Sequence, residues 1–248
     1  MDKYGIIGYP LGHSYSRGFF TDKFRKEGVD AEYVNFPIPS VEQLPNIVRD
    51  NPELRGLNVT LPHKQAVIPM LDELSDEACQ IGAVNVIRVR RKYGKAYLKG
   101  FNSDIIGFMD SIRPLLKPSH RKALILGTGG ASRAVRVGLE RLGVEWSYVS
   151  RTPCSGQYAY DALTPDVMSE HTVIVNCSPV GMFPKSEECP AIPYNLLTPA
   201  HLLFDVVYNP EETLFMKRGA EQGATVKNGL EMLRLQAVAS WEFWNSED

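Results

Sequence analysis

The sequence is poor in the features that mark several classes of protein. It has four cysteines in 248 residues, Cys79, Cys154, Cys177 and Cys189, and none of them forms a C-x-x-C pair. No histidine stands at zinc-finger spacing from them, so we predict no metal site. A disulfide framework is not expected at this length, and the thiols are interpreted as buried or incidental groups in a reducing compartment, the cytoplasm.

Long apolar runs and an excess of either charge are also missing. No stretch approaches the roughly 20 residues that a membrane-spanning helix needs, and no signal peptide precedes the first strand-like stretch. The chain has 27 Lys and Arg against 29 Asp and Glu, a formal net charge of -2. This balance gives no electrostatic footprint for a nucleic acid or an anionic membrane, and we expect neither as a partner.

Hydrophobic spacing predicts an α/β protein. In the first half, strands are expected at residues 4–9, 32–36 and 54–61, with helices at 16–27 and 41–49. Residues 84–90 and 96–98 are expected to form a hairpin at the edge of that sheet. In the second half, strands are expected at 123–126, 146–149, 172–175 and 202–207, and helices at 131–142 and 230–244. The alternation indicates βαβ units and mainly parallel sheets.

At this length two domains are favoured over one. We expect the boundary within residues 102–118, where a connecting helix over 104–116 is ended by Pro114 and Pro118. The prediction is a first domain at 1–103, a second at 104–228, and a final helix within 229–248 that packs back on the first. A cleft between two such domains is a common place for a ligand.

A glycine turn is the main nucleotide signal. A predicted strand leads into Gly127, and a predicted helix opens after Gly130 and Ala131, with Gly129 in the turn. Glycines let backbone N–H groups approach a pyrophosphate at the positive end of a helix. This pattern predicts a Rossmann-like dinucleotide-binding domain. The alternative is an ordinary tight turn between a strand and a helix.

The end of the next strand indicates which dinucleotide is bound. In NAD-binding domains an acidic residue near this position holds the ribose 2′-hydroxyl, but here the chain reads Ser150-Arg151-Thr152. A guanidinium fork with two flanking hydroxyls suits a 2′-phosphate, which favours NADP. The alternative is a surface arginine that follows a strand.

Polar residues in the first half form candidate chemical segments, and those that carry Lys64 and Asp104 lie immediately beyond a predicted strand. Lys64 can take the hydroxyl proton during an alcohol oxidation, and Asp104 can orient it; the alternatives are a solvated helix residue and a helix N-cap. Ser14 and Ser16 lie in a loop that suits a small carboxylate, unless Ser16 only caps a helix. Asn85 offers a side-chain amide at a strand entrance.

These segments together resemble the shikimate dehydrogenase family, in order and over nearly the whole chain. The matching segments are GYPLGHSYS at 8–16, NVTLPHK at 58–64, GAVN at 82–85, NSD at 102–104, GTGGASR at 127–133, SRT at 150–152, DVVYNP at 205–210 and NGLEML at 228–233. Departures from the usual pattern include Arg17 for Pro, Val86 and Ser103 for Thr, Ile105 for Gly and Ser150 for Asn.

The resemblance implies a substrate-binding α/β domain, a Rossmann-like NADP-binding domain and reversible reduction of 3-dehydroshikimate to shikimate, a step toward the aromatic amino acids. Lys64 and Asp104 match the family's catalytic pair. The residues that match its substrate binders are Ser14, Ser16, Thr60, Asn85, Tyr208 and Gln236. Those that match its cofactor binders are Gly127, Gly129, Gly130, Ala131, Ser150, Arg151, Thr152, Gly229 and Met232.

Three other interpretations remain open at this point. One is an enzyme of the same fold that acts on quinate, or on both acids, with NAD. The second is an NADP-binding sensor that has lost turnover, and the third is a structural Rossmann module that binds a protein. A monomer and a homodimer are equally compatible with the sequence.

Overall fold

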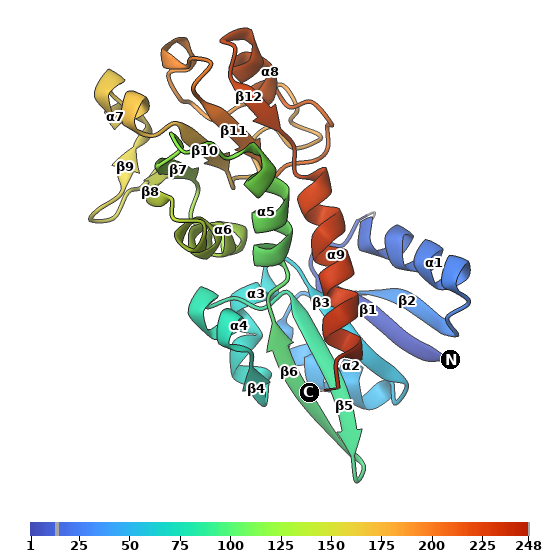
Figure 1. The fold of residues 1–248 in the computed structure, drawn as a ribbon. Helices are drawn as coiled ribbons and strands as arrows, with labels where there is room; N and C mark the ends of the chain where they lie inside the picture. Colours follow the sequence, from blue (N-terminus) through green and yellow to red (C-terminus); the bar gives the residue numbers. More distant parts are fainter. Residues whose placement is uncertain (13–14, 248) are drawn as a thin grey trace. The chain divides into compact units, whose positions relative to one another are not determined.

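The computed structural model describes residues 1–12 and 15–247, and it divides the chain into two compact units. Unit 1 comprises Met1–Ser103 and Ala237–Asp248, and unit 2 comprises Asp104–Gln236. Each unit is built on its own β-sheet with helices on both faces (Figure 1). The predicted fold class, two α/β sheets with a C-terminal helix that returns to the first, is confirmed.

The sheet of unit 1 is mixed, in the order β2-β1-β3-β5-β6-β4 within the described residues. Strands β1 and β3 are parallel, β5 is antiparallel to β3, and β6 is antiparallel to β5, so β1, β3 and β6 run in the same direction. The strands are β1 (Asp2–Gly8), β2 (Ala31–Pro37), β3 (Leu54–Val59), β4 (Glu73–Leu74), β5 (Val86–Lys92) and β6 (Lys95–Phe101). The hairpin was predicted at the sheet edge, but the short β4 pairs with β6 outside it.

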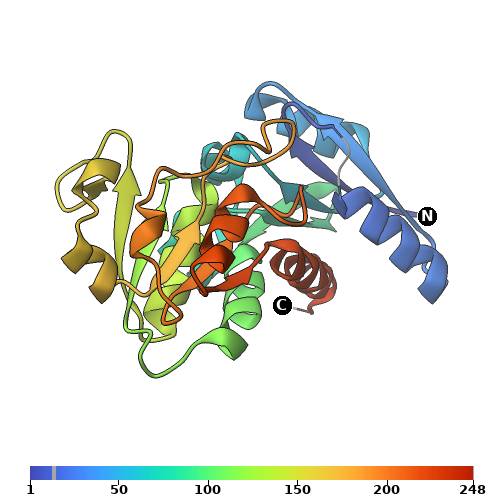
Figure 2. The same cartoon turned by 90° about the horizontal axis from the view of Figure 1, so that it is seen from above.

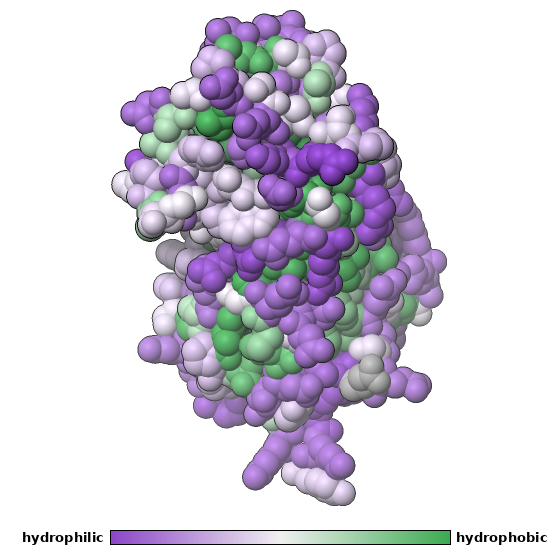
Figure 3. Space-filling model, turned by 60° about the vertical axis from the view of Figure 1, so that its left-hand side comes forward, coloured by the Kyte–Doolittle hydropathy of each residue, from purple (hydrophilic) through white to green (hydrophobic). Residues whose placement is uncertain are grey.

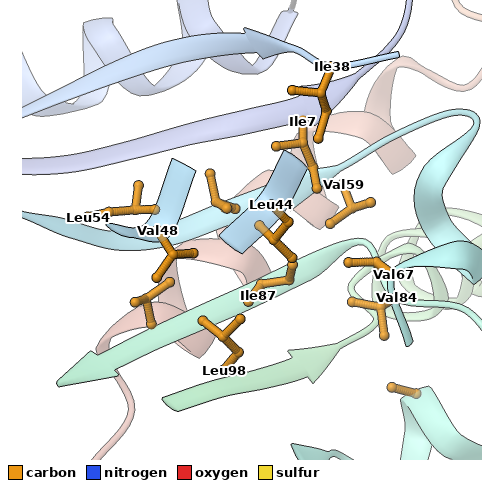
Figure 4. Close-up of a cluster of buried hydrophobic side chains, with 13 residues drawn as sticks. Ile7, Ile38, Leu44, Val48, Leu54, Val59, Val67, Val84, Ile87 and Leu98 are labelled. Atoms are coloured by element: carbon orange, nitrogen blue, oxygen red, sulfur yellow. The ribbon is translucent and has the colours of Figure 1, made fainter. Parts of the chain in front are cut away.

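Helices cover both faces of this sheet (Figure 2). On one face, Leu44 and Val48 of α2 pack against Ile7, Val59 and Ile87 of the strands, as Figure 4 shows. On the other face lie α1 and the second half of the last helix, in a cluster rich in aromatic rings. The helices of unit 1 are α1 (Tyr15–Glu27), α2 (Leu44–Asp50), α3 (His63–Ala66) and α4 (Asp76–Ile81).

The sheet of unit 2 is parallel throughout, in the order β12-β11-β10-β7-β8-β9 within the described residues. Side chains alternate along β7: Ala123 and Ile125 face α5 and α6, whereas Leu124 and Leu126 face α7 and α8. The strands are β7 (Lys122–Leu126), β8 (Glu145–Ser150), β9 (Tyr158–Ala159), β10 (Val173–Asn176), β11 (Leu202–Asp205) and β12 (Thr225–Lys227), and the helices are α5 (Asp104–Ile112), α6 (Gly130–Arg141), α7 (Pro165–Glu170) and α8 (Leu214–Glu221).

The last helix, α9 (Leu230–Asn245), is shared between the units. Its first turns belong to unit 2, where it lies so close to α5 that a Cβ on Gly107 would come within 2.4 Å of the Met232 carbonyl oxygen. From Ala237 onward the helix belongs to unit 1. The sequence predicted a helix that returns to the first domain as a whole, whereas the structure divides it after Gln236.

The surface agrees with the balanced charge of the sequence and its lack of long apolar runs. On the face drawn in Figure 3, hydrophilic residues predominate and hydrophobic residues show only as patches between them. Within the part of the chain that the structure describes, no helix combines the length and the apolar character that spanning a membrane requires.

Candidate active site

In unit 1, the polar segments that follow β1, β3 and β6 and the one that precedes β5 meet at one edge of the sheet. This edge carries the carboxyl ends of β1, β3 and β6 and the start of β5. Backbone hydrogen bonds join the segments there: Thr60 N–H donates to Ile7 O, Val59 N–H to Asn85 O and Asn85 N–H to Phe101 O. Ligands are commonly bound at the carboxyl ends of strands, and these bonds fix the segments relative to one another.

Residues predicted to contact the substrate occupy this edge. Thr60 follows β3 and is half-buried, while Asn85 precedes β5 and is buried. Lys64 is half-buried on α3, and its carbonyl oxygen accepts from Val84 N–H at 2.7 Å, which anchors it beside Asn85 in the fold. Ser16 lies in the first turn of α1, hydrogen-bonded to Tyr33. Ser14 lies outside the described residues.

Sequence reasoning missed the buried polar side chains behind this edge. Asn58, Ser103 and Ser240 are each no more than 4% exposed and are joined by hydrogen bonds to one another or to Asn85. Asn58 and Ser103 lie within motifs that the sequence singled out, but Ser240 lies on α9 and gives no local signal. This buried set supports the predicted substrate residues from inside unit 1.

In unit 2, the glycine turn has the geometry that a phosphate requires. Gly127 has a φ of +97°, a conformation that favours glycine. Gly129 is the N-cap of α6, with no side-chain cap, and a Cβ built on it meets nothing within 4 Å. The first turn of α6 carries no acidic residue. Backbone N–H groups and open space therefore coincide at the positive end of a 12-residue helix.

The predicted 2′-phosphate residues lie at the end of the adjacent strand. Ser150 ends β8 and is half-buried, and Arg151 and Thr152 are exposed beyond it. Thr152 N–H donates to Ser150 Oγ at 3.2 Å, which makes a compact turn. The arginine acts electrostatically on Tyr160, since it opposes the rise in the pKa of that phenol caused by burial. The guanidinium thus stands at the carboxyl edge, one strand away from the glycine turn.

Other predicted residues of unit 2 lie on neighbouring segments. Tyr208 is 37% exposed in the loop after β11, whereas Asp104, Met232 and Gln236 are buried. Gly229 packs so tightly that a Cβ there would come within 2.1 Å of Val206 O, so only glycine fits at this position. The loop that carries Tyr208 therefore packs closely against the segment that precedes α9.

A buried carboxylate holds the loop of Tyr208 in place. Asp205 Oδ1 accepts from Asn176 Nδ2 and Val207 N–H at 3.0 Å each, and its Oδ2 accepts from Thr213 Oγ1 at 2.6 Å. These bonds join the loops after β10 and β11. Burial raises the pKa of Asp205 to about 6, against the opposing effect of the three hydrogen bonds. The neighbouring Cys177 and Tyr194 stay neutral, because burial raises the pKa of both far above the ordinary range.

We expect Asp205 to make part of the stability depend on pH. Because its folded pKa of about 6 exceeds the ordinary 3.8, the folded state binds the proton more tightly. The free energy of unfolding should therefore fall as the pH rises from about 4 to above 6. Asp205→Asn stays uncharged, so its stability relative to the parent protein should increase over that range. Urea midpoints of the two proteins across the same pH range measure this, and parallel profiles would contradict it.

Among the described residues, no group of three or more His, Cys, Asp and Glu side chains is arranged to hold a metal ion. The four cysteines are free thiols. The candidate residues at the two sheet edges include the Asn85 amide, the hydroxyls of Ser16 and Thr60, Lys64 and Arg151, which are groups that bind organic anions and hydroxyls.

Comparison with known proteins identifies relatives of this arrangement. Residues 6–87 match the family model described as the shikimate dehydrogenase substrate binding domain. A shikimate dehydrogenase (NADP(+)) from Methanosphaera stadtmanae is 32% identical, over 98% of this chain and 91% of its own length.

Two solved structures are similar along the whole chain. The shikimate dehydrogenase of Aquifex aeolicus has a TM-score of 0.85 and 34% identity, covering 98% of this chain and 92% of its own. That of Thermus thermophilus, in complex with NADP(H) and shikimate, has a TM-score of 0.85 and 30% identity, covering 99% of this chain and 94% of its own.

Proposed function

This chain belongs to the shikimate dehydrogenase family, and from that premise we propose that it catalyses the NADP-dependent, reversible reduction of 3-dehydroshikimate to shikimate. The observation that carries the proposal is the distribution of the family's residues: Thr60, Lys64 and Asn85 lie at the carboxyl edge of the first sheet, and the glycine turn with Arg151 lies at that of the second. The structure of the Thermus thermophilus relative in complex with NADP(H) and shikimate supports the assignment of both ligands.

The residues of unit 2 fit NADP. The N-terminus of α6 and the open side of Gly129 suit the pyrophosphate, and Arg151, with Ser150 and Thr152, suits the 2′-phosphate. Ala131 and Gly130 lie in the first turn of α6, and Gly229 and Met232 border the place that we assign to the nicotinamide. When bound there, the cofactor supplies the hydride donor or acceptor.

The residues of unit 1 are assigned to the substrate. Ser14 and Ser16 would hold its carboxylate, and Thr60 and Asn85 its hydroxyls, with Tyr208 and Gln236 of unit 2 as further partners. Lys64 would take the proton of the hydroxyl that becomes the ketone and return it in the reverse direction, and Asp104 would orient the ammonium group. The substrate domain is thus residues 1–103 and the cofactor domain 104–228, with α9 shared.

A crossed assay tests the function. Shikimate and quinate are each supplied with NADP and with NAD, and reduced nicotinamide is followed by its absorbance. We expect shikimate with NADP to give the highest kcat/KM. Faster turnover of quinate would assign the enzyme to that acid, and no turnover with either acid would leave the sensor or the structural module as the better description.

The four free thiols favour the cytoplasm as the compartment.

A further inference from the structure

The part of the C-terminal helix that belongs to unit 1 buries one hydroxyl among apolar side chains. In unit 1, α9 faces the sheet with Ala237 and Trp244, which belong to an aromatic cluster. Ser240 lies between them in the sequence and is completely buried. A buried polar group costs free energy unless it is hydrogen-bonded, and an apolar residue would satisfy the packing pattern at this position equally well. The exception therefore points to a role other than packing.

Ser240 is hydrogen-bonded to two side chains of the sheet edge. Its Oγ accepts from Asn58 Nδ2 at 3.0 Å, although the two residues are 182 positions apart. The Oγ of Ser240 also lies 3.2 Å from Ser103 Oγ, a hydrogen bond in which either hydroxyl can be the donor. The orientation of Asn58 is fixed in turn by Tyr33, whose hydroxyl donates to Asn58 Oδ1 at 2.8 Å.

The same contacts reach Asn85 from two directions. Ser103 N–H donates to Asn85 Oδ1 at 2.7 Å, and Asn85 Nδ2 donates to Ser103 Oγ at 2.9 Å. A backbone N–H can only donate, so this pair excludes the flipped amide. Asn58 Nδ2 also donates to the carbonyl oxygen of Asn85 at 3.3 Å. Since an amide is planar, fixing one N–H of Asn85 also sets the direction of the second.

We propose that Ser240 is a positioning residue for the substrate side: through Ser103 and Asn58 it fixes the Asn85 amide, and so makes substrate affinity depend on how α9 is seated. This rests on the proposed function, in which Asn85 binds a ring hydroxyl of the substrate. The C-terminal helix then contributes to recognition without a substrate contact from this hydroxyl.

Steady-state kinetics test the proposal with Ser240→Ala. The net contribution of one hydrogen bond is about 0.5–1.5 kcal/mol, so its loss should raise KM for shikimate roughly 2- to 10-fold. KM for NADP should change less than about twofold, since residues 104–228 are untouched. The matched control is Ser111→Ala, since Ser111 is equally buried but donates only to the Phe108 carbonyl of its own helix. An unchanged KM for shikimate, or equal rises in both KM values, would overturn the proposal.

A double variant tests whether the effect passes through Asn85. In an Asn85→Ala background the amide is absent, so Ser240→Ala should leave the Kd for shikimate, measured by calorimetry, unchanged. A further loss of affinity in that background would show that Ser240 acts by another route and would refute the proposal.

Hydrogen exchange gives a readout that needs no substrate. The Ser103 amide donates to Asn85 Oδ1, so Ser240→Ala should speed exchange at residues 102–104 while β1 and β3 stay protected as before. A uniform acceleration across unit 1 would indicate general destabilisation and would reject the proposal. If this local change is found but no acid is turned over, the positioning of the Asn85 amide by Ser240 stands, and the proposed function fails.

Discussion

Lys64→Ala is expected to lower kcat for shikimate oxidation by about 10² to 10⁴, the usual contribution of a positioned proton-transfer group. KM for shikimate should change little, because the residues that we propose to bind its carboxylate and hydroxyls remain. We expect the loss in kcat because hydride leaves the ring carbon only when a group takes the hydroxyl proton. Lys64 lies at the carboxyl edge of the first sheet, next to Thr60 and Asn85 in the fold.

The control for this variant is Lys95→Ala, which removes the same charge from the exposed start of β6 and should leave kcat unchanged. Circular dichroism would verify that both variants fold. A Lys64→Ala enzyme with the kcat of the parent protein would remove Lys64 from the mechanism, and a loss confined to KM would make it a binding residue.

Arg151→Ala is expected to raise KM for NADP by roughly 10- to 100-fold, since a hydrogen bond to a charged group contributes about 1.5–3 kcal/mol. KM for NAD should stay nearly constant, because that cofactor has no 2′-phosphate for the guanidinium to bind. The preference for NADP over NAD would then fall by the same factor. The measurement is kcat/KM for each cofactor at saturating shikimate.

Arg121→Ala is the matched control, since Arg121 is an exposed arginine just before β7, at the opposite end of the same sheet. It should leave both cofactors unaffected. Equal effects of Arg151→Ala on NADP and NAD would show that Arg151 does not distinguish them, and the choice of cofactor would have to lie elsewhere in unit 2.

Local patterns in the sequence predicted the elements that are long or regular. The strand, glycine turn and helix at β7–α6 lie within about two residues of the expected bounds, because alternation and glycine conformations act over a few residues. The connecting helix α5 is shorter than expected: it ends at Ile112 and continues as a 3-10 turn through Leu115, since Pro114 cannot continue the α-helical hydrogen bonds.

Several short elements were missed. The two-residue β4 and β9, the three-residue β12, and the helices α3, α4, α7 and α8 were not predicted. The helices α4, α7 and α8 were missed although Ser75, Thr164 and Thr213 cap their N-termini. The three strands are too short for an alternation to be recognised, and their places depend on partners that are distant in the sequence. This is why the hairpin of β5 and β6 was wrongly placed at the edge: β4 supplies the missing neighbour by pairing with Lys99 and Gly100.

The sequence by itself determined the two α/β units, the glycine turn with its arginine, and the motifs that place Lys64, Asn85 and Asp104 at strand ends, because these features depend on neighbours along the chain. Only the tertiary structure decided which buried groups fix them in place. Tyr33, Asn58 and Ser240 come from three distant segments, and no local period encodes such a meeting. It arises because the sheet edge and the returning helix bury polar groups together, and a buried polar group must find a partner wherever the fold provides one.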